Sequence, residues 1–279
     1  MRKAKVIPSK GKKYFRDFFR FYLTGKTVGI TGSTGALGSY MAKVFAKNGA
    51  SVAVLGNNVE KGKAIAEEIK KDGGKAEFFK FNVCDDESIK TGLADIVKTF
   101  GGIDIWINNA GVNVPAEERF HIDKFSDEWW KKIVSVDMDG VYKCSKYVVP
   151  YLRERKGSNI INISSVVGMV PFRNQVAFTA AKAGVINMTK AMALELADDN
   201  IRVNCIAPGT ICMDKTAALW AKDDSMKRLL DHIPQHRQGD PDEIAYPTLF
   251  IADSYMSGYI TGQCLAVDGG WTCGYARDF

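Results

Sequence analysis

The segment TGSTGALG, residues 31–38, contains residues suited to holding a phosphate group. It follows an apolar, β-branched run at 27–31 and leads into a segment of helical period from about Leu37. A strand, a glycine-rich turn and a helix in this order aim backbone N–H groups and a helix N-terminus at a pyrophosphate. Gly32 permits the tight turn and Gly38 permits close packing of helix on sheet, while Ala36 stands where the usual GxxxGxG spacing has its middle glycine. The segment predicts a dinucleotide site.

Five further segments strengthen this prediction. They are NNAG (108–111), NISS (162–165), FTAAK (178–182), IAPGTI (206–211) and VDGG (267–270). Together with the glycine turn, in order and at the expected separations, they resemble the short-chain dehydrogenase/reductase family over residues 25–271. The resemblance implies a nicotinamide-dinucleotide site and the interconversion of a secondary alcohol and a ketone.

The resemblance also implies which residues contact the coenzyme. The turn after the first strand would wrap the pyrophosphate, and the residues after the third strand would lie beside adenine. The segments after the fourth and sixth strands would pass the ribose and border the nicotinamide. In chain order, the residues that it places at the coenzyme are Gly32, Ser33, Thr34, Leu37, Gly38, Asn82, Val83, Asn109, Ala110, Gly111, Lys182, Pro208, Gly209 and Ile211.

The end of the second strand, where such sites distinguish NAD from NADP, carries Gly56, Asn57 and Asn58. An NAD site usually has an acid there for the ribose diol, and an NADP site places Arg or Lys near the 2′-phosphate. Neither is present, although Lys61 and Ser33 are candidates for the phosphate and the absent acid removes a repulsion. We therefore predict NADP(H) rather than NAD(H), by a small margin, with Asn57 and Asn58 beside the coenzyme.

Ser165 and Lys182 match the family's catalytic serine and lysine. In the family, a hydride passes between the nicotinamide and a carbinol carbon while a tyrosine phenol passes the proton. The lysine charge lowers the pKa of that phenol from its ordinary value of about 10. The serine holds the substrate oxygen, and an asparagine positions the lysine through water.

Two departures from this pattern lie in the catalytic segments. Phe178, thirteen residues beyond Ser165, occupies the position of the tyrosine, and the flanking AFTAAKAGV keeps the rest of the family's pattern. Asp137, in VDMDG, occupies the position of the asparagine. The carboxylate could add to the electrostatic support of Lys182, but it puts the water relay in doubt. Because general acid catalysis contributes about 10²–10⁴ in rate, we predict a chain that binds dinucleotide but turns over poorly.

Phe178 has two interpretations. A deliberate tyrosine-to-phenylalanine exchange deletes one oxygen, keeps the ring packing and silences such an enzyme. A natural pseudoenzyme should also have lost the catalytic residues at positions 165 and 182, but Ser165 and Lys182 are both present. We therefore favour an inactive variant made by exchange, with the natural pseudoenzyme as the alternative.

The elements that must position these residues alternate along the chain from Lys26. Helical segments such as 86–100, with apolar residues on one face, separate the strand candidates. This alternation predicts an α/β, doubly wound Rossmann-type fold with seven parallel strands and helices on both faces. The predicted strands are 27–31, 51–55, 76–81, 103–107, 159–163, 201–206 and 263–267.

The chain of 279 residues shows no internal repeat and no Pro/Gly/Ser linker, so we predict one domain at 25–279. Within it, residues 210–240 are a long excursion after the sixth strand, where such folds build a substrate lid. Residues 1–24 form a basic arm with a net charge of about +7. The remaining residues have a net charge near −1, which gives the total of +6. The body is therefore not a nucleic-acid platform.

An aromatic stripe in this arm, Phe15, Phe18, Phe19 and Tyr22, has helical spacing. We expect it to dock on the protein itself or on a sister subunit, in preference to a membrane surface, because the stretch is short. The six cysteines form no CxxC pair and no zinc-like spacing with the histidines. We therefore predict no metal and a reducing, cytoplasmic location.

The substrate would lie over the nicotinamide. Residues expected within reach are Ser165, Asn113, Met169, Phe172, Met213 and Trp220. Their mixture suits a sugar-derived polyol or a hydroxysteroid-like alcohol, and the resemblance implies a homotetramer. Two alternatives stay open: a non-catalytic dinucleotide sensor that acts through the arm, and an epimerase or dehydratase that uses hydride transfer only transiently.

Overall fold

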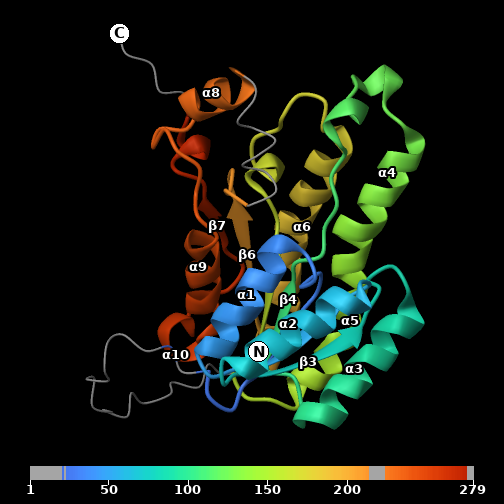
Figure 1. Ribbon diagram of the computed structural model, residues 1–279, viewed down its shortest axis with the longest axis vertical. Helices are drawn as coiled ribbons and strands as arrows, with labels where there is room; N and C mark the ends of the chain where they lie inside the picture. Colours follow the sequence, from blue (N-terminus) through green and yellow to red (C-terminus); the bar gives the residue numbers. More distant parts are fainter. Residues whose placement is uncertain (1–20, 22, 214–223, 275–279) are drawn as a thin grey trace, which may run out of the picture.

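The computed structural model describes residue 21, residues 23–213 and residues 224–274. These residues form a single Rossmann-like domain around one sheet of seven parallel strands, as the sequence predicts, in the order β3-β2-β1-β4-β5-β6-β7 (Figure 1). The chain order reverses between β1 and β4, which is the point where ligands bind in open sheets of this kind. The strands, each within two residues of its predicted bounds, are β1 (Thr27–Ile30), β2 (Ser51–Gly56), β3 (Lys75–Lys80), β4 (Ile105–Asn108), β5 (Asn159–Ile163), β6 (Arg202–Pro208) and β7 (Cys264–Val267).

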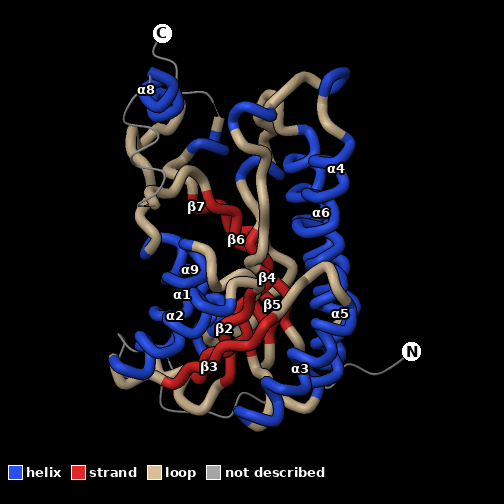
Figure 2. The backbone as a smooth tube through the Cα atoms, turned by 45° about the vertical axis from the view of Figure 1, so that its right-hand side comes forward, coloured by secondary structure: helices blue, strands red, loops and turns tan. Residues whose placement is uncertain are grey.

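Helices cover both faces of the sheet (Figure 2). One face packs against α1 (Ala36–Lys47), α2 (Val59–Lys71) and α9 (Asp242–Ala252). The other packs against α3 (Asp86–Phe100), α5 (Gly140–Arg153) and α6 (Val176–Glu195). The remaining described helices are α4 (Asp127–Val134), α8 (Asp224–Asp231) and α10 (Ser254–Ser257). Short turns of 3-10 helix are η1 (Ala116–Glu118), η2 (Ile122–Lys124), η4 (Val166–Gly168), η5 (Ala197–Asp199) and η6 (Trp271–Cys273), and η3 (Ser135–Asp139) is a π-helical turn.

The central strands β1, β4 and β5 are buried along their whole length. This explains why they read as continuous apolar runs, since parallel strands with helices on both faces meet no water on either side. The predicted helix at 86–100 is confirmed, and its ends follow from local chemistry. Asp85 accepts hydrogen bonds from the N–H groups of Glu87 and Ser88, and Gly101 ends the helix in a left-handed conformation.

A buried chain of polar side chains fixes α5 and α6 against the sheet. Asn108 Nδ2 donates to Asn162 Oδ1 at 2.8 Å and to Ser145 Oγ at 3.0 Å. Asn162 Nδ2 in turn donates to Thr189 Oγ1 on α6 at 2.8 Å. Leaving a buried polar group without its hydrogen-bond partner costs free energy. This network therefore resists rotation of α6 relative to β4 and β5.

Several predicted features lie outside the described residues. These are most of the arm at 1–24, including Phe15, Phe18, Phe19 and Tyr22, and the part of the predicted lid at 214–223, including Trp220. The described part of the lid contains α8 and a bridge between Ile211 and Gly239. Among residues 23–213 and 224–274, no helix is both long and apolar enough to cross a membrane.

Candidate active site

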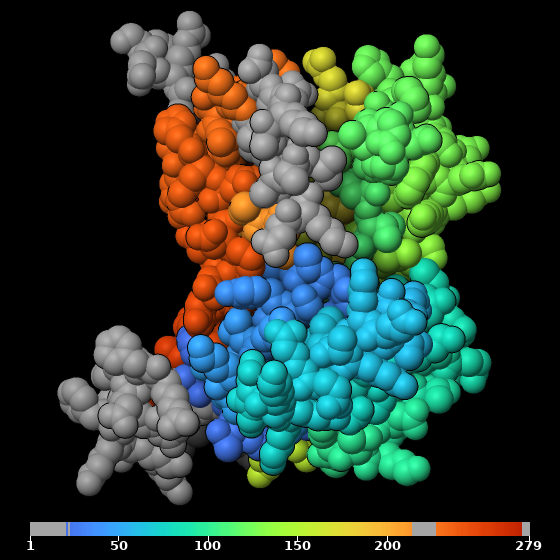
Figure 3. Space-filling view, viewed as in Figure 1, coloured from blue at the N-terminus to red at the C-terminus, as the bar shows by residue number. Residues whose placement is uncertain are grey.

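A cavity of about 670 Å³ opens at the carboxyl ends of β1, β4, β5 and β6. In the space-filling view, α1 and α2 form the lower flank of this face, and segments that follow β4 and precede β7 form the upper flanks (Figure 3). The cavity brings together sequence segments more than 170 residues apart. Of the residues predicted for coenzyme and catalysis, those that line it are Gly32, Thr34, Leu37, Gly38, Asn57, Asn58, Asn82, Val83, Asn109, Ala110, Gly111, Asp137, Ser165, Phe178, Lys182, Pro208, Gly209 and Ile211.

The glycine turn is packed too closely for side chains at two positions. Gly32 has φ of +66°, and a Cβ there would lie 2.7 Å from Ala110 Cα. A Cβ on Gly38 would lie 2.6 Å from both Asn109 Nδ2 and Gly32 O. Helix α1 begins at Ala36, so the alanine in place of the middle glycine simply enters the first helical turn. No side chain caps this helix, which leaves its first N–H groups available to a pyrophosphate.

Ser33 does not line the cavity, which is a correction to its expected role at the pyrophosphate or 2′-phosphate. Its side chain is fully buried, and its Oγ donates to Ile30 O at 2.8 Å and accepts from Leu55 N at 2.7 Å. Its own N–H donates to Leu55 O at 2.9 Å. With these groups occupied, Ser33 joins β1 to β2 and has no group left for a phosphate.

Asn57 and Asn58 are exposed at the rim of the cavity, next to the end of β2. Asn58 Oδ1 accepts from the Lys61 N–H at 2.9 Å and caps α2. Among the described lining residues near this strand end, none carries a carboxylate. The rim therefore offers amide groups to whatever binds there.

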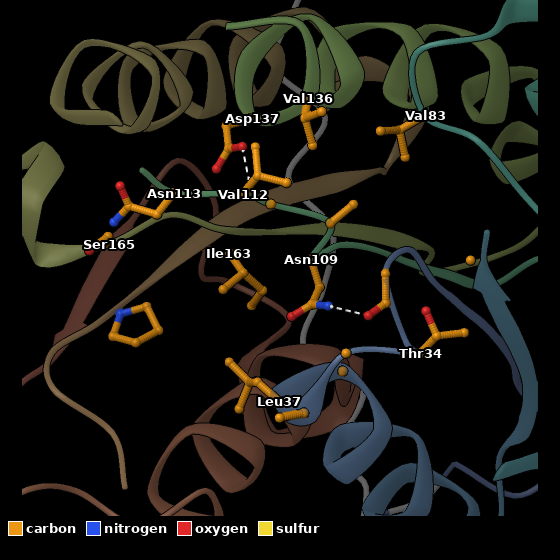
Figure 4. A pocket seen from close by; sticks show the side chains of 18 of the residues that line it. Thr34, Leu37, Val83, Asn109, Val112, Asn113, Val136, Asp137, Ile163 and Ser165 are labelled. Atoms are coloured by element: carbon orange, nitrogen blue, oxygen red, sulfur yellow. Dashed lines mark hydrogen bonds between the residues drawn. The ribbon is translucent and has the colours of Figure 1, made fainter. Parts of the chain in front are cut away.

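The segment after β4 is tied to the glycine turn (Figure 4). Asn109 Nδ2 donates to Thr31 O at 2.9 Å, and Thr31 Oγ1 accepts from the N–H groups of Asn109 and Ala110 at 2.9 and 3.0 Å. These bonds join the two backbone segments that the sequence predicts to contact the pyrophosphate and the ribose. The two segments are therefore held at a fixed separation.

Ser165 lies half-buried just after β5, and Phe178 and Lys182 lie one turn apart on α6. Ser165 Oγ accepts from Val167 N at 3.3 Å, so its proton is free to be donated. The Lys182 ammonium lies 5.5 Å from the centre of the Phe178 ring. Ser164 Oγ donates to Lys182 O at 2.8 Å and thereby joins the serine segment to the lysine helix.

Asp137 lies in the π-helical turn η3 and is fully buried. Its Oδ1 accepts from Val112 N at 2.8 Å, and its Oδ2 forms an ion pair with Lys182 Nζ at 3.0 Å. Lys182 Nζ also donates to Ile163 O at 3.2 Å. Burial raises the pKa of the Asp137 carboxyl, while the Lys182 charge and the Val112 N–H oppose that rise. Single π-helical turns inside helices occur frequently at functional sites.

The structure separates the residues predicted to contact substrate. Ser165 and Asn113 line the cavity, and Asn113 Nδ2 donates to Gln175 Oε1 at 3.1 Å. Phe172 instead lines a neighbouring depression, and its ring lies 4.5 Å from that of Trp271. Met169, 44% exposed, and Met213 line neither. Trp220 lies outside the described residues.

Several lining residues were not predicted from the sequence. Among them are the apolar residues Val112, Val136 and Ile163, and Figure 4 shows Val136 beside Asp137 and Ile163 between Ser165 and Asn109. Each lies within two residues of a predicted site residue in the chain, so proximity in sequence was the available signal. Gly35, Ala36, Gly56, Phe81 and Ser164 also line the cavity. No motif distinguishes these valines and this isoleucine from ordinary core residues.

The sheet order and the cavity at its carboxyl edge define an α/β protein of the Rossmann type, and comparison with known proteins places it in a family. The chain matches the family described as enoyl-(acyl carrier protein) reductase over residues 32–272. It is 38% identical over 250 residues to the 3-oxoacyl-[acyl-carrier-protein] reductase FabG of Chlamydia muridarum, covering 89% of this chain and 98% of that one. The chain therefore belongs to this family of short-chain dehydrogenase/reductase oxidoreductases, whose members use NAD(P).

Two further similarities show the breadth of its relatives. The 2,5-dichloro-2,5-cyclohexadiene-1,4-diol dehydrogenase LinX of Sphingobium indicum is 38% identical over 252 residues, covering 90% of this chain and 98% of that one. A structure from Haemophilus influenza, assigned as a D-mannonate oxidoreductase and solved with bound NAD, superposes with a TM-score of 0.87 at 31% identity. That match covers 91% of this chain and 97% of the other.

Proposed function

We propose that this protein binds a nicotinamide dinucleotide in the cavity and acts on a secondary alcohol or ketone held at Ser165. The observation that carries the proposal is the convergence of the glycine turn, the segment after β4 and Lys182 on a single cavity. The coenzyme supplies or accepts the hydride when bound. Gly32, Gly38 and the N-terminus of α1 hold its pyrophosphate, and Asn109 to Gly111 support its ribose.

Each catalytic side chain has a role that follows from its bonds. Ser165 can donate its proton to a substrate oxygen, because its Oγ already accepts from Val167. Lys182 has three N–H donors, and one of them is directed at Ile163 O. The Asp137 carboxylate lies 3.0 Å from the ammonium as its ion-pair partner, and we propose that a remaining donor serves the coenzyme or substrate. Phe178 places an apolar ring where a proton donor would stand, so we propose that turnover is low.

Other hydroxyl groups near the site do not replace the missing phenol. Ser164 donates to Lys182 O, Thr179 lines the neighbouring depression, and Tyr147 donates to Asp86 at 2.7 Å on α3. Each is engaged or directed away from the cavity. This supports a site that binds its ligands without a dedicated proton donor at position 178.

The proposal is tested by Phe178→Tyr. We expect calorimetry to give similar dinucleotide affinities for both proteins. We expect turnover to rise toward the range of about 10²–10⁴ that general acid catalysis contributes. The substrate panel should include a 3-oxoacyl thioester, a cyclic diol, a sugar acid, a polyol and a hydroxysteroid, because the relatives act on differing classes. Dinucleotide binding with no turnover by either protein on any of these would favour a non-catalytic sensor instead.

The coenzyme proposal extends to NADP(H) in modest preference to NAD(H). Its support is that none of the described cavity residues at the end of β2 carries a carboxylate. A carboxylate at this point would repel the 2′-phosphate of NADP(H). The buried Ser33 hydroxyl gives it no support. Calorimetric titration with NADPH and NADH in parallel tests it, and tighter binding of NADH would overturn it.

A further inference from the structure

Asp137 and Lys182 are the two charged residues among the described residues that line the cavity. They face each other at 3.0 Å, and their side chains are 0% and 6% exposed. Coulomb interactions are strong where water is excluded. A carboxylate this close therefore cancels most of the field that the ammonium would otherwise project onto neighbouring positions.

Position 178 is one of those neighbouring positions. The Phe178 ring centre lies 5.5 Å from Lys182 Nζ, and Asp137 approaches the ammonium from the separate turn η3. In the family pattern, an unpaired lysine charge is what makes a phenol at this position easier to ionise. Here that charge already has a partner.

We propose that Asp137 is a positioning residue that neutralises Lys182 toward position 178, so that Asp137 and Phe178 are two halves of one coupled change. The inference deepens the proposed function, since it concerns the position at which a proton donor would act. It also explains why the two departures from the family pattern occur together, which an isolated exchange at position 178 would not.

The chemistry of the side chain shows why an asparagine would behave differently. Asp137 Oδ1 accepts from the Val112 N–H, and this fixes the other oxygen toward Lys182. An asparagine that kept the bond to Val112 would direct its NH₂ group at the ammonium. Two donors cannot bond to each other, so Lys182 would need another acceptor and its charge would be unpaired.

The proposal predicts the ionisation of a tyrosine introduced at position 178. In Phe178→Tyr the phenol meets a neutral pair and should titrate near its ordinary pKa of about 10. In Phe178→Tyr with Asp137→Asn it meets an unpaired ammonium, and an opposite charge nearby lowers such a pKa by about 1–3 units. The alkaline range suits the comparison, since Asp137 is then ionised.

The test is a pH titration of both variants with 13C-labelled tyrosine, followed by NMR. The resonance that is absent from the parent protein reports the introduced tyrosine directly, although the chain contains ten other tyrosines. We expect the pKa of the introduced phenol to be at least about one unit lower in the double variant. Equal values, or a lower value in the single variant, would overturn the proposal.

Two controls keep the result interpretable. Asp137→Asn alone, with thermal unfolding and dinucleotide titration, shows whether the fold and the cavity are retained. If the asparagine variant does not fold, Phe178→Tyr with Asp137→Ser makes the same comparison with a small neutral side chain. A purely structural role for Asp137 would alter stability in these proteins without moving the titration of the introduced phenol.

Turnover separates this inference from the proposed function. A phenol titration that depends on residue 137, without turnover on any substrate, would support the role of Asp137 and contradict the oxidoreductase proposal. Turnover in Phe178→Tyr, together with a phenol pKa that does not depend on residue 137, would support the oxidoreductase proposal and contradict the role of Asp137. If both hold, the double variant should exceed Phe178→Tyr in kcat, and its pH profile should move to lower pH.

Discussion

The two walls of the cavity differ in whether backbone groups or side chains form the surface that a ligand would contact. The wall proposed for the coenzyme, residues 32–38 and 109–111, is built mainly from backbone groups and from close approaches that exclude side chains. The Asn109 side chain ties its two segments together. The proposed catalytic wall is built from side chains, and a few hydrogen bonds hold three of them, Asp137, Ser165 and Lys182. Its fourth member is the Phe178 ring. We expect the first wall to tolerate a residue change that leaves the path of the backbone unaltered. In the second, a single oxygen changes the available chemistry.

The residues that depart from the family pattern follow this division. Ala36 replaces a glycine in the coenzyme wall, yet α1 begins there and the turn keeps its bond from Gly35 N to Gly32 O. In the proposed catalytic wall, Phe178 and Asp137 stand where the family pattern has a tyrosine and an asparagine, and we propose that they remove a proton donor and pair the Lys182 charge. Small changes of side chain thus have unequal consequences on the two sides of one cavity.

The largest effect that we expect on folding is at Asp137. Asp137→Ala leaves the Lys182 ammonium buried without its partner, and breaking a buried ion pair in this way costs about 3–5 kcal/mol. Replacing both residues, as Asp137→Leu with Lys182→Met, should cost clearly less because no charge is stranded. Urea unfolding of the three proteins measures this. A double variant as unstable as Asp137→Ala would show that packing, and not charge, dominates.

The same carboxyl gives a pH dependence of definite sign. Burial raises its pKa in the folded protein, so the folded state holds this proton more tightly than the unfolded chain does. The resulting stabilisation is complete below the ordinary aspartate pKa of about 3.9. It is lost as pH rises through the raised value. As pH rises from the ordinary aspartate pKa through the raised pKa of Asp137, the parent should therefore lose stability relative to Asp137→Asn. Urea unfolding of both proteins across this pH range measures the difference. A parent that gains stability relative to Asp137→Asn would contradict the prediction.

The sequence predicted the elements well, and most of the predicted site residues line one cavity, for reasons tied to particular residues. Strands such as β4 and β5 are buried on both faces, so their apolar runs are visible without a structure. Their carboxyl ends carry the matching motifs, and parallel strands bring those ends to one edge. The seven strands and their single domain are therefore confirmed.

What the sequence did not predict depends on directions of side chains. Ser33 follows a strand within a phosphate-binding motif, yet its hydroxyl turns to Leu55 because β2 lies within bonding distance. The direct contact of Asp137 with Lys182 depends on the π-helical turn η3, which adds a residue to one turn and has no periodic signature. Phe172 faces Trp271, which is far from it in the sequence.

A substitution at Gly38 should show how the coenzyme wall fails. In Gly38→Ala the new Cβ would meet Asn109 Nδ2 and Gly32 O at 2.6 Å, and relieving such overpacking costs about 1–3 kcal/mol. We expect dinucleotide affinity to fall by about 10- to 100-fold, with the Ser165 side of the cavity unaffected. Ser39→Ala, one residue further along α1, is the matched control. Equal affinity in Gly38→Ala and the parent would mean that the turn can relax without loss.

The smallest effect should come from restoring the family's residue in the coenzyme wall. Ala36→Gly changes the first residue of α1, where a glycine costs roughly 0.5–1 kcal/mol of stability relative to alanine. Because the backbone path is already correct with alanine, dinucleotide affinity should stay within about threefold of the parent, which is below one kcal/mol. Calorimetric titration beside Phe178→Tyr makes the contrast direct, since both variants restore a family residue. A large gain in dinucleotide affinity from Ala36→Gly would mean that the side chain at position 36 affects coenzyme binding directly. The proposed difference between the coenzyme wall and the catalytic wall would then be wrong.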